Sequence, residues 1–281
     1  MADLNRVNRL LTHQRAELGR AELIRGWSLA LQFLLALLAA ASVFSNDGGH
    51  LLALAGVGVL VLTVWLVCDA YYRRHRAAGD QARRLLLIVR GFEKEVAELG
   101  VIQAGFTAPV AKLSAVPIED YFATIAPAGP ERVAEMIDES AFFTADLQRR
   151  SGELMLLIMF FALVLVGLTW FAFAPQLDGS VRVIAARVLL AFGVFLLSSD
   201  VLGAAFAHIH AATSMETIRY RLSAARTRHY PLGDVLQAMA DYNAAVEGAP
   251  LPLPGVYQRQ QDELNPAWAE YKQLTGIGSR A

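Results

Sequence analysis

The chain has 281 residues, of which 55% are hydrophobic, and it carries a formal net charge of −1. Its mean hydropathy is +0.39. Soluble domains are about 45–50% apolar even when glycine is counted, so this composition argues against an ordinary soluble protein and favours a membrane protein. The single cysteine, Cys68, excludes an intramolecular disulfide. The first apolar run begins only at Trp27, after a charged segment that is too long and too acidic for the start of a signal peptide, so none is predicted.

Alternation of charged and apolar stretches predicts an all-α membrane protein with four transmembrane helices in two hairpins and helical cytosolic extensions. The expected segments are a cytosolic N-terminal helix (1–26), a transmembrane hairpin (27–70), a cytosolic helical insert (71–152), a second transmembrane hairpin (153–207) and a cytosolic helical tail (208–281).

The N-terminal segment has helical spacing, with Val7, Leu11 and Leu18 near one side. It fits a juxtamembrane helix or part of a ligand or partner surface. In the first predicted span, Trp27 to Phe44, Ser28 and Gln32 are four residues apart and therefore share a helix face. That face suits helix packing or the lining of a pore, and Gln32 is the pore candidate.

The second predicted span, Leu51 to Ala70, ends in two tyrosines and the arginines Arg73 and Arg74, a pattern typical of a cytosolic membrane exit. Apolar residues at a three-four spacing then predict a helical stalk as far as Glu98. Gly79 and Gly91 are points at which this stalk could break. Residues 100–129 contain several prolines and predict a connector packed on the stalks, with Tyr121 and Phe122 as core residues.

A single long helix is expected from Pro130 to Phe173, polar at first and free of charge from Leu154 onward. Its apolar part is long enough to cross a hydrocarbon core of about 30 Å. The fourth predicted span, Val183 to Ala207, carries Arg187 and Ser198 eleven residues apart, on one face of a helix. These two residues are further pore candidates, although Arg187 lies near the outer end and could instead snorkel to the interface.

The helix is expected to continue beyond His208, with Met215, Ile218, Leu222 and Ala225 as an apolar stripe between two rows of arginines. Such rows suit a solvated helix or a phosphate site. We define the basic collar as the arginines expected around the axis of an oligomer on the cytosolic side. Its members are Arg73, Arg74, Arg149, Arg150, Arg219, Arg221, Arg226 and Arg228. Repeated in each subunit, the collar predicts a site for a polyanion.

Lys and Arg are absent from the two short loops 45–50 and 174–180, whereas five lie in the N-terminal tail, eleven in 71–152 and seven in 208–281. The positive-inside rule therefore places both termini and the insert in the cytosol. No phosphate-binding loop, zinc-protease, nucleophile-elbow or paired CxxC motif is present. The sequence predicts no enzyme, no catalytic residues, no metal site and no cofactor.

The layout resembles the bacterial SMODS-associated four-transmembrane effectors, pore formers encoded beside nucleotide-synthesising enzymes in antiphage defence. The resemblance covers the charged lead-in with Leu11-Thr-His-Gln-Arg15, the two hairpins, the insert and the tail. Its closing segment contains Asp241-Tyr-Asn, then Pro250-Leu-Pro-Leu-Pro-Gly-Val-Tyr257, then Glu263-Leu-Asn265.

This resemblance implies a homo-oligomeric channel, with a tetramer as the first guess, in the bacterial inner membrane. A nucleotide or oligonucleotide from a partner nucleotidyltransferase would either open it or hold it shut. Two alternatives stay open: a non-conducting membrane scaffold or sensor that recruits cytosolic partners, and a small transporter. The transporter is disfavoured because the two hairpins show no clear internal repeat.

Overall fold

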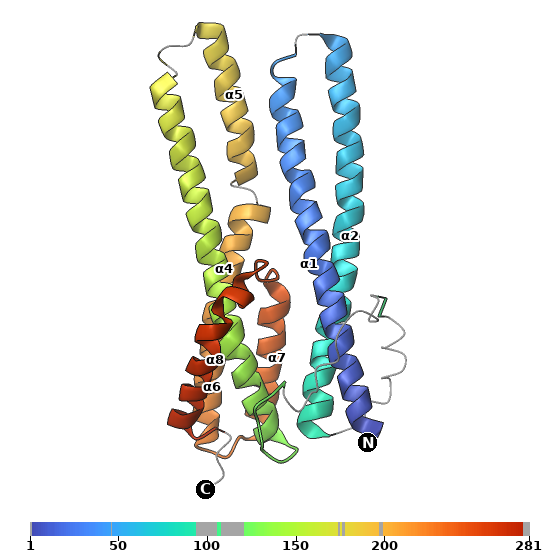
Figure 1. Cartoon of the computed structure of the whole chain (residues 1–281), viewed down its shortest axis with the longest axis vertical. Helices are drawn as coiled ribbons and strands as arrows, with labels where there is room; N and C mark the ends of the chain where they lie inside the picture. Colours follow the sequence, from blue (N-terminus) through green and yellow to red (C-terminus); the bar gives the residue numbers. More distant parts are fainter. Residues whose placement is uncertain are drawn as a thin grey trace. The chain divides into compact units, whose positions relative to one another are not determined.

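The computed structural model describes residues 2–45, 47–93, 106–107, 121–173, 175, 178–196 and 199–277. Within these residues the long elements are all helical and no strand occurs, which confirms the predicted all-α class (Figure 1). The elements are α1 (Ala2–Ser42), α2 (Gly48–Phe92), α4 (Pro130–Phe173), α5 (Gly179–Leu196), the π-helical turn η3 (Ser199–Gly203), α6 (Ala204–Arg226), α7 (Leu232–Gly248) and α8 (Val256–Thr275).

The chain divides into two compact units. Unit 1 consists of Met1–Glu22, Arg73–Ser151 and Ala207–Ala281, and unit 2 of Leu23–Tyr72 and Gly152–Phe206. The helices α1, α2 and α4 each contribute residues to both units without a break.

Three helices are long and apolar enough to cross a membrane, over Val7–Ser42, Gly48–Phe92 and Pro130–Ala172. The expected long helix from Pro130 to Phe173 is confirmed with the same bounds. In unit 2, large apolar side chains such as Leu52, Leu165 and Phe171 are exposed, Phe171 to 80%. A soluble unit would bury such a continuous apolar surface, so these helices suit a hydrocarbon solvent.

The region predicted as a fourth span is not one regular helix. α5 begins at Gly179, earlier than expected, and ends at Leu196, and the π-helical turn η3 precedes α6. Ser, Asp and Gly are poor helix formers because they bond locally to the backbone or lack a side chain, and Ser199, Asp200 and Gly203 all fall in this turn. The expected continuation beyond His208 is confirmed, since α6 extends to Arg226.

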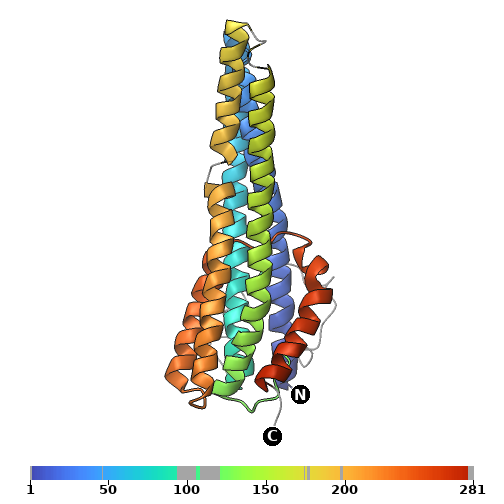
Figure 2. The ribbon, with the colours of Figure 1, turned by 90° about the vertical axis from the view of Figure 1, so that its left-hand side faces the viewer.

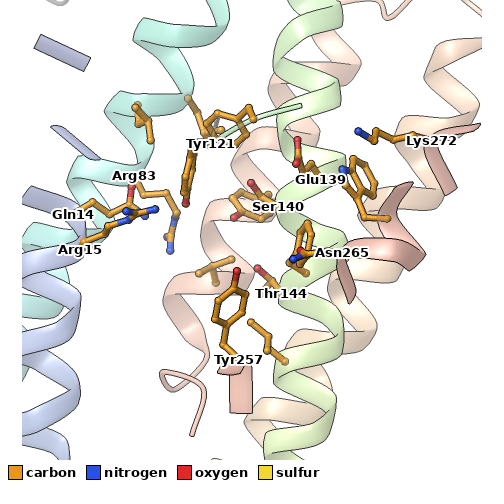
Figure 3. Close-up of a pocket in the computed structure, with 18 of the residues that line it drawn as sticks. Gln14, Arg15, Arg83, Tyr121, Glu139, Ser140, Thr144, Tyr257, Asn265 and Lys272 are labelled. Atoms are coloured by element: carbon orange, nitrogen blue, oxygen red, sulfur yellow. The ribbon is translucent and has the colours of Figure 1, made fainter. Parts of the chain in front are cut away.

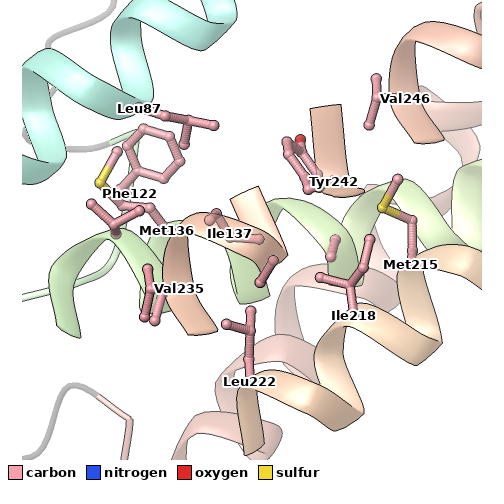
Figure 4. Packing of buried hydrophobic residues seen from close by; sticks show 14 of the residues in the cluster. Leu87, Phe122, Met136, Ile137, Met215, Ile218, Leu222, Val235, Tyr242 and Val246 are labelled. Carbon is pink, nitrogen blue, oxygen red and sulfur yellow. The ribbon is translucent and has the colours of Figure 1, made fainter. Parts of the chain in front are cut away.

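The core of unit 1 is built from amphipathic faces of α4, α6 and α7, with Leu87 of α2 and Phe122 against them (Figure 4). On α4, Val133, Met136 and Ile137 are 0% exposed, the i, i+3, i+4 spacing of one helix face. The predicted stripe of α6 (Met215, Ile218, Leu222 and Ala225) is buried in the same cluster, and Phe122 is confirmed as a core residue. α6 lies alongside the first part of α4 in both views (Figures 1 and 2), and the Arg219–Asp138 ion pair joins the two helices.

Helix α2 continues through Gly79 and ends at Phe92, one residue after Gly91; both glycines are close-contact positions. A Cβ built on Gly79 would lie 2.6 Å from Cδ2 of Leu18, and one on Gly91 would lie 2.3 Å from Cγ2 of Val133. The absence of a side chain therefore lets α2 approach α1 and α4 inside unit 1. A buried pair between His75 and Glu17, 2.5 Å from Nδ1 to Oε2, also joins α2 to α1.

Candidate functional site

A cavity of about 810 Å³ lies inside unit 1 (Figure 3). Its walls come from α1, α2, residues 121–122, α4, α7 and α8, so segments from the whole length of the chain meet there. We call it the unit 1 pocket. Concave sites lined by apolar and aromatic side chains with a few polar groups are the usual ligand sites of proteins, so the unit 1 pocket is the candidate functional site.

One wall of the unit 1 pocket carries two arginines. The Arg15 guanidinium lies 5.4 Å from the ring centroid of Tyr121, and that of Arg83 lies 5.8 Å from the ring centroid of Tyr242. Arg83 is 9% exposed and pairs through Nη1 with Asp80 at 3.1 Å. Burial raises the pKa of the Tyr121 phenol, and the nearby Tyr242 acts in the same direction. The tyrosine is therefore neutral and offers the arginine an uncharged ring face.

The remaining wall comes from α4 and α8 and is polar and aromatic. It includes Glu139, Ser140 and Thr144 of α4, and Tyr257, Asn265, Trp268 and Lys272 of α8. Burial raises the pKa of the Glu139 carboxyl, opposed by a 2.9 Å hydrogen bond from the Ala123 N–H and by the charge of Lys272. The part of the pocket lining that the structure describes thus contains three cations and one carboxyl group.

An aromatic cluster holds α8 against α4. Trp268 stacks on Tyr271 with ring centroids 5.4 Å apart, and Phe142 lies 5.3 Å from Trp268. The Arg219 guanidinium sits 4.8 Å from the centroid of Phe142 and 4.5 Å from that of Tyr271. Burial raises the pKa of Asp138, while the 2.9 Å contact with Arg219 Nε opposes that rise. This packing fixes the side of the pocket formed by α8.

The connector between α7 and α8, Ala249–Gly255, is held by side chains from two other helices. The Arg76 Nη2 of α2 donates to the carbonyls of Val246 (2.7 Å) and Ala249 (3.1 Å). Gln148 Nε2 of α4 donates to the Pro250 carbonyl at 3.1 Å, and the Leu253 N–H donates to Ser151 Oγ at 3.0 Å. His208 of α6 contacts Gln148 through Nδ1. The proline-rich connector is therefore tied to α2, α4 and, through Gln148, α6.

The basic collar arginines all belong to unit 1, but most of them face carboxylates. Arg149 contacts Glu216 at 2.5 Å, and Arg150 contacts Asp146 at 2.9 Å and Glu263 at 3.3 Å. Arg219 pairs with Asp138, Arg221 with Asp241 and Arg228 with Asp234. Arg73 and Arg74 are exposed on α2, and Arg226 is half-buried on α6. At least five of the eight arginines thus contact carboxylates, which reduces the positive field that the sequence pattern suggests.

The pore candidates belong to unit 2. Gln32 is half-buried on α1 and Arg187 is exposed on α5, while Ser198 lies outside the described residues. α1 and α5 meet next to Gln32, where the ring centroid of Phe33 lies 6.1 Å from that of Phe192 and 6.0 Å from that of Phe195.

Sequence reasoning missed the unit 1 pocket. Its charged residues Arg15, Arg83 and Lys272 are separated by tens to hundreds of residues, and no local spacing relates them.

No protein-family model matches the chain, and comparisons with curated proteins and with solved structures found no match.

Proposed function

We propose that this chain is a pore-forming membrane effector of bacterial antiphage defence, gated from the cytosolic side by a nucleotide or oligonucleotide that a partner nucleotidyltransferase makes. The observation that carries the proposal is the packing of three separate chain segments into unit 1, with one of the two stretches of unit 2 between successive segments. That arrangement supports four membrane crossings, with the ligand-accessible unit on one side of the bilayer.

Continuity of the chain supports an even number of crossings. A bilayer cannot divide a packed unit whose segments touch through contacts such as Arg219–Asp138 and Arg76–Val246. The chain leaves unit 1 after Glu22 and returns at Arg73, and it leaves again after Ser151 and returns at Ala207. Each excursion must therefore cross an even number of times. Because α4 supplies one apolar crossing in the second excursion, α5 and η3 supply the return.

The length of α5 suits this role. Its 18 residues span about 27 Å at 1.5 Å per residue, close to a hydrocarbon core of about 30 Å. The side of unit 1 is assigned by charge: its three segments contain four, eleven and seven Lys and Arg, whereas unit 2 contains three. The positive-inside rule then favours unit 1, and both termini, in the cytosol.

Transmission of a ligand signal is supported by helix continuity. α1, α2 and α4 each run uninterrupted from unit 1 residues into unit 2 residues, so a change of packing in unit 1 moves apolar segments directly. The exposed apolar side chains of unit 2 offer surface for lipid and for further copies of the chain. We propose a homo-oligomer, with a tetramer as the first guess, whose pore includes Gln32, Arg187 and Ser198.

The test is membrane potential in cells that express this chain together with its neighbouring nucleotidyltransferase or with a catalytically dead form of that enzyme. Depolarisation only with the active enzyme identifies a ligand-opened channel. Depolarisation only with the dead enzyme identifies a channel that the ligand holds shut. Unchanged potential in both strains, including during phage infection, contradicts the pore and favours the scaffold.

A further inference from the structure

We propose that the unit 1 pocket, and not the basic collar, binds the controlling ligand, and that this ligand is an anion with a planar aromatic ring, of mono- to dinucleotide size. The proposal rests on the proposed function in one respect, that the chain is controlled by a ligand. The pocket itself is independent of whether the chain conducts ions.

The charged side chains of the pocket walls indicate the sign of the ligand charge. Among the described residues, Arg15, Arg83 and Lys272 line the pocket together with a single carboxyl group, that of Glu139. Asp80 and Glu247 contact Arg83 but do not line the pocket. Burial raises the pKa of Glu139, while the Ala123 N–H and the charge of Lys272 oppose that rise. The cavity therefore favours an anion.

Two residues of the pocket wall each contain a buried polar atom that has no hydrogen-bond partner among the described residues. Gln14 is 7% exposed and Arg83 is 9% exposed. Gln14 Oε1 and Arg83 Nε both lack a partner among the described residues. Figure 3 shows both side chains on the same wall, beside Arg15. An unsatisfied buried polar atom costs about 1–3 kcal/mol. Both atoms are covered in the structure, so a ligand in the pocket reaches them only when the Gln14 and Arg83 side chains turn toward the cavity.

Aromatic side chains in the pocket lining favour a ligand with a planar ring. Tyr121, Tyr242, Tyr257, Phe143 and Trp268 all line the cavity. A planar base can stack on such rings, and each stacked base contributes about 1–3 kcal/mol. Hydroxyls of Ser140 and Thr144 and the amide of Asn265 add donors and acceptors for sugar and base atoms.

Volume limits the size of the ligand. A cavity of about 810 Å³ lies within the roughly 300–1,000 Å³ of typical small-molecule sites. That range fits a mononucleotide or a dinucleotide and excludes the simultaneous burial of a long oligonucleotide. A longer strand would place one end in the pocket.

The collar is the weaker site, because it is already occupied by protein carboxylates. Five of its eight arginines contact Asp or Glu, for example Arg149 with Glu216 at 2.5 Å. An incoming phosphate would have to displace these contacts, as it would those of Arg83 with Asp80 and Glu247. Arg15 and Lys272 also line the pocket, and neither forms an ion pair with a described residue.

The experiment measures quenching of tryptophan fluorescence in the full chain, held in nanodiscs, on titration with AMP, GMP, CMP, UMP and the linear diadenylate. Trp268 lines the pocket and reports occupancy. Adenosine and inorganic phosphate are titrated as partial ligands. We expect saturable binding of at least one nucleotide. Adenosine lacks the charge and inorganic phosphate lacks the ring, so the affinity of each should be at least about tenfold lower.

The variants are Arg15→Gln and Lys272→Gln. Each should weaken nucleotide binding about tenfold, the usual effect of losing a hydrogen bond to a charged group. Two matched controls carry the same loss of charge elsewhere: Arg20→Gln, exposed on α1 outside the pocket, and Arg149→Gln in the basic collar. Both controls should bind as the parent chain does.

Three results would overturn the proposal. The first is that none of the five nucleotides binds saturably. The second is that phosphate binds as tightly as every nucleotide. The third is that Arg149→Gln weakens nucleotide binding whereas Arg15→Gln and Lys272→Gln do not. The last result would assign the ligand to the collar. The binding measurement does not depend on ion flow. A chain that binds nucleotide normally but never depolarises cells would therefore contradict the proposed pore and still support the proposed ligand site in the unit 1 pocket.

Discussion

At the scale of single residues, the tightest packing in unit 1 depends on glycines of α2. Gly91→Ala places a methyl group 2.3 Å from Cγ2 of Val133, which is 0% exposed and β-branched. Valine has one strongly preferred rotamer in a helix, so it cannot turn away. We expect Gly91→Ala to destabilise unit 1 by about 1–3 kcal/mol, the usual cost of overpacking, measured as a lower midpoint of thermal unfolding by circular dichroism.

The matched control is Gly19→Ala on α1, where nothing lies within 4 Å of an added Cβ. That change should stabilise the helix by up to about 1 kcal/mol through propensity alone. Adding Val133→Ala to Gly91→Ala should cost less than the sum of the two single changes, because it removes the clashing methyl group. Equal effects of Gly91→Ala and Gly19→Ala would refute the close contact.

Residue-scale electrostatics explain why the collar looked stronger in sequence than it is in the structure. A helical wheel places Arg219 and Arg226 on one side of α6 and Arg221 and Arg228 on the other, but it does not show what faces them. The carboxylates that pair with Arg219, Arg221 and Arg228 come from α4 and α7. Such partners depend on tertiary packing, which a single helix pattern does not encode.

At the scale of elements, the connector between α7 and α8 links the unit 1 pocket to the helices that enter unit 2. Val246 and Tyr257 line the pocket on either side of the connector. Arg76 and Ser151, which hold the connector, lie within a few residues of the points where α2 and α4 pass between the units. A ligand that shifts Tyr257 or Val246 therefore acts on the chain close to both transition points.

Arg76 is the element-scale test of this link. Its side chain is buried, pairs with Asp80 at 2.8 Å and donates to two carbonyls at the end of α7. Arg76→Gln should destabilise unit 1 by about 3–5 kcal/mol, because it breaks a buried pair and leaves polar groups unpaired. Hydrogen–deuterium exchange should show the largest loss of protection in residues 246–255.

The control on the same helix is Arg84→Gln. Arg84 is half exposed and pairs with Glu247 of α7 at 2.7 Å, so it joins the same two helices from the surface. An exposed pair contributes about 0–1 kcal/mol, and exchange in the connector should change little. Similar exchange in the two variants would show that the connector does not depend on Arg76.

Elements differed in how far sequence could predict them. The bounds of α4 were predictable because a capping Pro-Glu start and a long apolar run are local signals. The apolar stripe of α6 was predictable from its 3.6-residue period. Ser199, Asp200 and Gly203 mark a weak point in the predicted fourth span, but their helix propensities do not specify that the backbone there is π-helical. The unit 1 pocket was not predictable, because its residues meet only through packing of α1, α2, α4, α7 and α8.

At the scale of the whole molecule, the fold predicts a topology that depends on α5 and η3. If those elements return the chain across the bilayer, residues on α2 and α6 within unit 1 face the same side. If they do not, α6 and everything after it face the opposite side, and unit 1 cannot assemble as one packed body. A measurement of the number of crossings therefore also tests whether unit 1 can assemble as one packed body.

Single cysteines in a Cys68→Ala background answer it. Asp47→Cys and Asp178→Cys report on the two short connections, and Ala77→Cys and Ser223→Cys report on exposed positions of α2 and α6 in unit 1. With a membrane-impermeant maleimide applied to spheroplasts, we expect labelling at 47 and 178, and labelling at 77 and 223 only after the membrane is opened. Labelling at 223 but not at 77 in sealed spheroplasts would mean three crossings. That pattern would remove the argument for a cytosolic tail, and the pocket built partly from α8 would then require a different assembly of the chain.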